Sequence, residues 1–254
     1  MHRFYVHPQS VGETTICFDP IESHHIEKVL RLKPGDRVRA FDGQGNEFSC
    51  ILRQRSEQGW MAEIQEQKSG LAEPYYRINL IQGLAKGDKM SMIIQKAVEI
   101  GIYSIIPLQS EYSVIHMNIE KANKKVGRWQ TIAREACKQC GRSYIPAVHL
   151  PQTMEEITRM AAGNSWIMLY EDEYDMDLGT CIKERGILKS RDLYVMVGPE
   201  GGFSQREADW VRRHGGYTVH LGQRILRTET AGLVAASILF YEAGDMATKE
   251  DLAW

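Results

Sequence analysis

The sequence has few of the features that mark membrane, secreted or generally basic proteins. Its longest apolar run, at 231–241, covers 11 residues, whereas a membrane-spanning helix needs about 20. The first ten residues, MHRFYVHPQS, lack the apolar stretch of a secretory signal. The five cysteines are odd in number and widely spaced, which argues against a disulfide framework and predicts a cytoplasmic protein.

A strong net charge is also missing. The formal value is −2 over 254 residues, which excludes a histone-like nucleic-acid binder. This small net charge results from opposite charges that cancel, because residues 1–70 carry −1, residues 71–150 carry +5 and residues 151–254 carry −6. Seven basic residues lie within 121–142 against one acid, Glu135. Taken alone, this basic stripe fits either a solvated helix face or a set of phosphate contacts.

Residues 1–70 are predicted to form a β-rich segment. RVRAF at 37–41 and EFSCIL at 47–52 flank a cluster of Asp, Gly and Asn, which predicts a hairpin. WMAEI at 60–64 alternates like a half-buried strand, and a short helix is expected at 24–32. A linker at 70–74 ends this small β module.

After the linker, strand-like and helix-like segments alternate, which predicts an α/β domain with a mostly parallel sheet. Gly101 follows a predicted helix at 90–100, as helix C-termini prefer. The expected strands are 77–83, 104–108, 165–170, 192–197 and 217–221, and the other expected helices are 120–140, 204–214 and 228–241.

A glycine-rich loop, GPEGGF at 198–203, follows the apolar strand at 192–197. Ser204 and Glu207 form a capping-box pattern that opens a helix directly after it. Glycines at the carboxyl end of a parallel strand let backbone amides approach a ligand, although a tight β-to-α turn explains them equally simply. The spacing fits neither a dinucleotide fingerprint nor a P-loop.

A second loop, LGQRILRTETA at 221–231, also joins a strand to an apolar helix. The two loops can form the floor and wall of one pocket if their strands share a sheet. Arg227 stands at the mouth of the helix, where a surface ion pair, for example with Glu229, is the simpler interpretation. Cys137 and Cys140 form a lone CxxC with no second ligand pair, so no metal is expected.

GPEGGFS followed by LGQRILRTETA resembles the ribosomal RNA small subunit methyltransferase E family of SPOUT-class enzymes. Arg3-Phe4, the HHIEKVLRLKPGDRVRAFDGQG stretch, QKAVEIG at 95–101 and REACKQCGR at 134–142 also fit, so the resemblance covers the whole chain. It implies a PUA-like RNA-binding β-barrel at 1–72 and a SPOUT methyltransferase domain at 73–254. That domain is expected to contain a deep trefoil knot and to form a homodimer.

The implied reaction is methylation of uridine N3 in 16S ribosomal RNA, within an assembled or partly assembled small subunit. S-adenosylmethionine is the implied methyl donor. Its expected contacts are Leu169, Gly198, Glu200, Gly201, Gly202, Leu221, Gly222, Ile225 and Leu226. The expected RNA contacts, drawn from the β module and the basic middle of the chain, are Arg3, His7, Lys33, Lys86, Lys89, Lys121, Lys124, Lys125, Arg128, Arg134 and Arg142.

Arg227 and Glu229 are the candidate catalytic residues. Uracil N3 becomes nucleophilic when its imide proton leaves, and a fixed cation stabilises the resulting anion. Glu229 is expected to orient Arg227, to remove the proton, or to act as a helix cap. Two alternatives stay open: a non-catalytic RNA-binding assembly factor, and a SPOUT enzyme that acts on another RNA or on a ribose 2′-hydroxyl.

Overall fold

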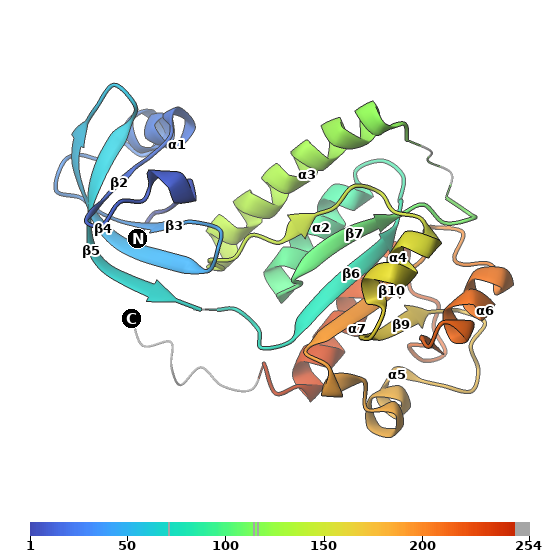
Figure 1. Cartoon of the computed structure of the whole chain (residues 1–254). Coiled ribbons are helices and arrows are strands. Elements are labelled where there is room, and N and C mark those ends of the chain that lie inside the picture. The colour runs from blue at the N-terminus through green and yellow to red at the C-terminus, as the bar shows by residue number, and fades with distance from the viewer. Residues whose placement is uncertain (71, 114, 116, 247–254) are drawn as a thin grey trace. The chain divides into compact units, whose positions relative to one another are not determined.

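The computed structural model describes residues 1–70, 72–113, 115 and 117–246. The chain divides into two compact units (Figure 1). Unit 1 comprises Met1–Glu73 together with Arg134–Ile145, and unit 2 comprises Pro74–Ala133 together with Pro146–Trp254. The N-terminal unit therefore takes up a segment from the middle of the chain.

Unit 1 is built on a curled five-stranded sheet in the order β1-β3-β4-β5-β2. The β1–β3 pair is parallel, and the other pairs are antiparallel. The predicted hairpin is confirmed, because β3 and β4 pair antiparallel, and the β4–β5 pair carries two register shifts. The strands are β1 (Arg3–Tyr5), β2 (Thr15–Cys17), β3 (Arg37–Phe41), β4 (Asn46–Arg55) and β5 (Trp60–Ser69).

The helix expected at 24–32 begins earlier than the sequence pattern indicated. Asp19 accepts a hydrogen bond from the Glu22 amide, and Pro20 occupies the first turn, so α1 is Pro20–His24. A π-helical turn, η2 (His25–Val29), follows it, and a 3-10 turn, η1 (Pro8–Ser10), lies after β1.

Buried charge ties the segment 134–145 to the rest of unit 1. Arg3 donates to a carboxylate oxygen of Glu47 at 2.8 Å and to the backbone carbonyls of Cys137 and Arg142. Glu73 accepts hydrogen bonds from the Arg142 guanidinium at 2.8 and 3.0 Å. It also accepts from the backbone amides of Ser143 and Tyr144.

Unit 2 confirms the predicted α/β fold. Its sheet has six strands, in the order β11-β9-β10-β6-β7-β8, and all of their pairings are parallel. Figure 1 shows β7, β6 and β10 side by side. The strands are β6 (Arg77–Gly83), β7 (Ser104–Leu108), β8 (Ala147–Val148), β9 (Ser165–Leu169), β10 (Asp192–Val197) and β11 (Tyr217–Val219).

Helices cover this sheet, and the four predicted ones, α2, α3, α6 and α7, form close to their expected bounds. Helix α2 ends at Gly101 in the left-handed conformation, and the Ser204–Glu207 capping box opens α6. Helix α7 packs against α2, β6 and β10. The helices are α2 (Lys89–Ile100), α3 (Ile119–Cys140), α4 (Met154–Ala161), α5 (Leu178–Thr180), α6 (Gln205–Arg213) and α7 (Thr228–Glu242), with short turns η3 (Cys181–Arg185) and η4 (Ile187–Lys189).

Replacing Glu73 by alanine is expected to destabilise unit 1. The Arg142 side chain is 4% exposed, and a buried charge that loses a carboxylate partner costs about 3 kcal/mol. Glu66→Ala is the matched control, because Glu66 pairs with Lys68 at the surface and such pairs contribute less than about 1 kcal/mol. Urea unfolding of both variants measures the difference. Equal shifts of the unfolding midpoint would show that the Glu73 contacts do not stabilise the unit.

Candidate active site

The glycine-rich loop folds tightly back on itself after β10. The Gly202 amide donates to the carbonyl of Pro199 at 3.0 Å, and Gly202 has a φ of +68°. A Cβ on Gly198 would lie 2.9 Å from the Gly202 carbonyl carbon. The backbone is therefore closed into a turn that side chains at these two positions would disrupt.

Strand β6 lies directly beneath this loop. Gly83 ends β6, and a Cβ there would lie 2.4 Å from the backbone nitrogen of Pro199. Such a distance is far below van der Waals contact, so Gly83 permits the approach of the loop to the sheet. The approach places the loop over the carboxyl ends of the central strands, where open α/β sheets bind ligands.

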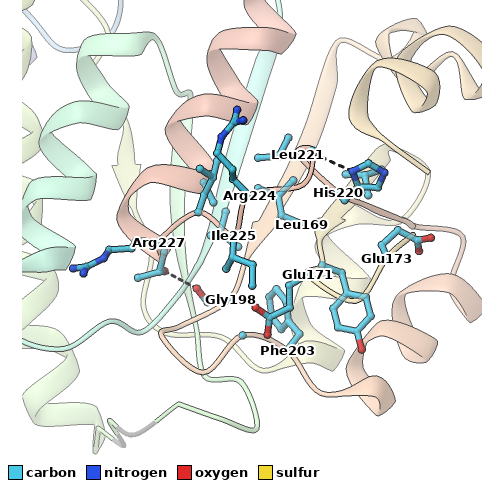
Figure 2. Close-up of a pocket in the computed structure, with 18 of the residues that line it drawn as sticks. Leu169, Glu171, Glu173, Gly198, Phe203, His220, Leu221, Arg224, Ile225 and Arg227 are labelled. Atoms are coloured by element: carbon cyan, nitrogen blue, oxygen red, sulfur yellow. Dashed lines mark hydrogen bonds between the residues drawn. The ribbon is translucent and has the colours of Figure 1, made fainter. Parts of the chain in front are cut away.

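A chain of buried hydrogen bonds joins this loop to α7. Gln82, which is fully buried, donates from Nε2 to Thr228 Oγ1 at 2.9 Å. Thr228 in turn donates to the carbonyl oxygen of Gly198 at 2.6 Å (Figure 2). One threonine hydroxyl thus fixes the start of α7 to the end of β10.

The two loops enclose a cavity of about 800 Å³. Leu169 from the end of β9, Leu221 and Ile225 from the second loop and Phe203 from the first give it an apolar lining (Figure 2). Ile225 is 80% exposed, so a large apolar side chain faces open space there. The cavity has the size and apolar character of a small-molecule site.

The cavity brings together most of the residues that the sequence singled out for a ligand. They are Leu169, Gly198, Glu200, Gly202, Leu221, Gly222, Ile225 and Leu226, together with the catalytic candidates Arg227 and Glu229. Gly201 is next to this lining, where a Cβ would lie 3.2 Å from Cβ of Tyr112. No sequence pattern singled out the further site residues Gln82, Thr228, Glu171, Glu173, Tyr174 and His220.

A three-membered ion-pair cluster lies at one side of the cavity. Lys89 Nζ is 3.1 Å from Glu200 Oε1 and 3.3 Å from Glu229 Oε2. Glu200 Oε1 also accepts from the Lys86 amide at 3.0 Å. Lys89, expected among the RNA contacts, is thus paired with two carboxylates. Glu229 pairs with Lys89, so the sequence interpretation of an Arg227–Glu229 surface ion pair was wrong.

The cluster keeps its members charged. The ion pair with Glu200, which is the largest cause, and the ion pair with Glu229 raise the pKa of Lys89 against the opposing effect of burial. The pKa of Glu229 is lowered by its own backbone amide, with Lys89 and the charge of Arg227 adding to the effect. Burial would raise the pKa of Glu200, but backbone amides and Lys89 lower it. Both carboxylates therefore stay ionised until the pH falls below the usual range of a glutamate.

Two further acidic side chains, Glu171 and Glu173, line the cavity. Glu173 accepts from Arg212 at 2.9 Å and from the Thr218 hydroxyl. Burial opposes the charge of Glu173, yet these hydrogen bonds hold its pKa below the ordinary value. Glu171 Oε1 would be 2.9 Å from a Cβ on Gly202, so this carboxylate lies against the glycine-rich loop.

Arg227 is exposed and precedes α7 as its N-terminal cap residue. Figure 2 shows its side chain extending away from Ile225 and Phe203. Among the residues that the structure describes, its guanidinium forms no salt bridge. It is therefore an available cation at the edge of the cavity.

Comparison with known proteins identifies the family. The RNA methyltransferase domain model matches residues 72–240, and the RNA methyltransferase PUA domain model matches residues 19–58. Ribosomal RNA small subunit methyltransferase E of Bacillus subtilis is 32% identical over 249 residues, covering 95% of this chain and 97% of the relative. This chain belongs to the ribosomal RNA small subunit methyltransferase E family.

Other members agree in sequence and in fold. The methyltransferase E of Buchnera aphidicola subsp. Schizaphis graminum is 30% identical and covers 88% of this chain and 89% of its own length. The crystal structure of the Neisseria gonorrhoeae methyltransferase E bound to S-adenosyl methionine has a TM-score of 0.84 and 32% identity. It covers 95% of this chain and 98% of its own.

In this methyltransferase E family member, the residues expected to contact RNA fall into two groups. Lys33, Lys86, Lys121, Lys124, Lys125 and Arg128 are exposed, as is His7. Arg3 and Arg142 are instead satisfied inside unit 1 by Glu47 and Glu73. Arg134, which is partly buried, lies over the ring of Tyr5 at 5.4 Å. The buried arginines hold unit 1 together, and the exposed lysines are the available cations.

The cysteine pair of this family member offers no reactive thiol. Burial raises the pKa of Cys137 to about 12 and also raises that of Cys140. Within residues 1–70, 72–113, 115 and 117–246, no group of three His, Cys, Asp or Glu side chains is arranged to hold a metal ion. No helix in the same ranges is long and apolar enough to cross a membrane.

Replacing Thr228 by valine is expected to lower the stability of unit 2 in this methyltransferase. The change keeps the side-chain shape but removes the donor to the Gly198 carbonyl, while Gln82 Nε2 keeps its bond to the Gly83 carbonyl, at a cost of about 1–3 kcal/mol. Thr230→Val is the matched control, because Thr230 is exposed two positions further along α7. Chemical denaturation measures both variants. A loss no larger for Thr228→Val than for Thr230→Val would contradict the role of the hydrogen-bond chain.

Proposed function

We propose that this protein uses S-adenosylmethionine to methylate N3 of a uridine in 16S ribosomal RNA. The observation that carries the proposal is the cavity between the two strand-end loops, with Arg227 at its edge, whose guanidinium forms no salt bridge with any described residue. The name of the relatives supports ribosomal RNA as the substrate. The S-adenosyl methionine bound to the Neisseria gonorrhoeae protein supports S-adenosylmethionine as the methyl donor.

The residues of the cavity fit this methyl donor. An adenine ring needs a flat apolar slot, which Leu169, Leu221, Ile225 and Leu226 provide. Its polar edges need backbone groups, which the glycine-rich loop and Gly222 expose; Gly222 has a φ of +91° with open space at its Cβ. When bound, S-adenosylmethionine supplies an electrophilic methyl group, so the reaction needs no metal.

Arg227 is the residue that we assign to the target base. Loss of the N3 proton to solvent water places negative charge on the uracil oxygens, and a guanidinium stabilises that charge. Glu229 is less suited to remove the proton, because its lowered pKa makes it a weak base. We therefore assign Glu229 to positioning. The target uridine has to leave its stack before N3 can be reached.

RNA binding is assigned to both units. We propose residues 1–72 as the RNA-binding barrel and 73–254 as the methyltransferase domain with its knot. Lys33 in the first, and Lys86, Lys124 and Arg128 in the second, are exposed cations suited to phosphate contacts. Arg134, whose side chain is 28% exposed, is a further candidate. Arg3 and Arg142 are left out, because their paired charges are buried. Arg128 is kept, because its side chain is 70% exposed and its partner Asp88 lies at the surface.

A homodimer is part of the proposal, with α7 at its interface. Between Ala231 and Tyr241 this helix is apolar on nearly every side, and such helices are normally buried all round. Tyr241 on it is 72% exposed in the single chain. The substrate proposed for the dimer is a small ribosomal subunit or its assembly precursor in the cytoplasm.

Transfer of a methyl group to the proposed base tests this function. Small subunits from a strain that lacks the methyltransferase are incubated with the purified protein and S-adenosylmethionine, and the 16S RNA is mapped by mass spectrometry. We expect one new N3-methyluridine. A methyl group on a ribose or on another RNA would replace the target assignment, and no methylation would favour the assembly-factor alternative.

Arg227→Ala is expected to reduce kcat strongly while leaving the affinity for S-adenosylmethionine nearly unchanged. Removal of one charge-stabilising donor costs about 10²–10³ in kcat. Arg224→Ala is the control, since Arg224 lines the same cavity from the preceding turn. Single-turnover methylation and calorimetry with the methyl donor separate the two effects. A parallel loss of binding and turnover would make Arg227 a structural residue.

Neutralising the exposed basic residues of α3 is expected to weaken RNA binding. In the triple variant Lys124→Gln, Lys125→Gln and Arg128→Gln, the slope of log K against log salt should fall by about 2–3. A second triple variant, at Lys183, Arg185 and Lys189, removes the same charge from exposed positions elsewhere in unit 2. If both triples change the slope equally, the α3 stripe is a solvated face.

A further inference from the structure

Three segments far apart in the sequence meet at the Lys89 ammonium group. Lys89 begins α2, Glu200 lies in the loop after β10, and Glu229 lies in the first turn of α7. All three line the cavity. Lys89 is 32% exposed and Glu229 is 14% exposed, so the pair is partly shielded from water.

Without Lys89, the Glu229 carboxylate would have a second cation within reach. Arg227 is two positions away, and its charge already acts on Glu229. The Arg227 guanidinium forms no salt bridge with any described residue, so nothing else in that part of the chain competes for it. A carboxylate and a guanidinium at a partly shielded cavity edge attract each other.

We propose that Lys89 is a positioning residue that holds Glu229 and thereby keeps Arg227 unpaired for the RNA substrate. The proposal rests on the function proposed above for Arg227. In it, Lys89 acts through Glu229 and touches neither the base nor the methyl donor. The positive charge at the cavity edge is available because the nearest carboxylate is already neutralised.

The same lysine fixes the outer edge of the glycine-rich loop. Glu200 is also held by the Lys86 amide, so it keeps one partner when Lys89 is replaced. Glu229 has no such second side-chain partner among the residues described. The main consequence of removing Lys89 therefore falls on Glu229 and on Arg227.

The first experiment compares Lys89→Met with Lys96→Met. Lys96 lies on the same helix and pairs with Glu99 at its surface, outside the cavity lining. Lys89→Met should lower kcat about tenfold, by pairing Arg227 with Glu229, and should leave KM for S-adenosylmethionine within about twofold. Lys96→Met should change neither value. An unchanged kcat, or a rise in KM with constant kcat, would overturn the proposal.

A double-mutant cycle decides whether Lys89 acts through Glu229. In the Glu229→Gln background there is no carboxylate to capture Arg227, so adding Lys89→Met should reduce kcat less than about threefold further. If Lys89→Met costs the same factor with and without Glu229, Lys89 acts by another route and the proposal is wrong. Lys89→Arg, which keeps the charge, should recover most of the activity.

The experiments separate a wrong function for the protein from a wrong role for Lys89. If the wild-type protein methylates no uridine, the proposed function fails before any variant is compared. If the wild type is active and Arg227→Ala is impaired, but the cycle shows no coupling between Lys89 and Glu229, only the inference fails. Circular dichroism and the unfolding midpoint of each variant exclude loss of fold as the cause.

Discussion

The candidate site depends on one buried hydroxyl group. Thr228 accepts from Gln82 and donates to Gly198, so it joins the end of β6, the end of β10 and the start of α7 at one point. The close approach of Gly83 to Pro199 presses the loop onto the sheet at the same place. With these contacts, the glycine-rich loop and the second loop face each other across a cavity. The apolar lining, the ion-pair cluster and the exposed Arg227 all follow from that arrangement.

Electrostatics divides the basic residues of the chain into distinct groups. Arg3 and Arg142 are buried beside carboxylates and stabilise unit 1. Lys89 neutralises two carboxylates at the cavity. The exposed residues of α3 and the exposed Arg227 keep their charge facing solvent. The near-neutral net charge of the chain thus contains a small number of available cations, which suits a selective contact with structured RNA better than general binding.

Local patterns predicted the elements that local physics controls. The bounds of β3, β6, β7 and β10 followed from apolar runs between turn residues, and the capping box at Ser204 placed α6. The strands β1, β2 and β8 are only two or three residues long, too short to show a period, so they were missed. Two loops that follow strands of one parallel sheet could be expected to form one pocket. The hydrogen-bond and ion-pair partners inside that pocket could not be predicted. Gln82 and Thr228 are 146 positions apart, and Lys89 meets its two carboxylates only in the folded chain.

The central claim is that both loops form a single site for S-adenosylmethionine. Hydrogen–deuterium exchange of the purified protein, with and without saturating S-adenosylmethionine, tests it most directly. The account predicts that protection rises together in two segments, at 198–204 and at 220–228, and remains unchanged in α3 and in unit 1. Protection confined to one of the two loops, or no change in either, would contradict it.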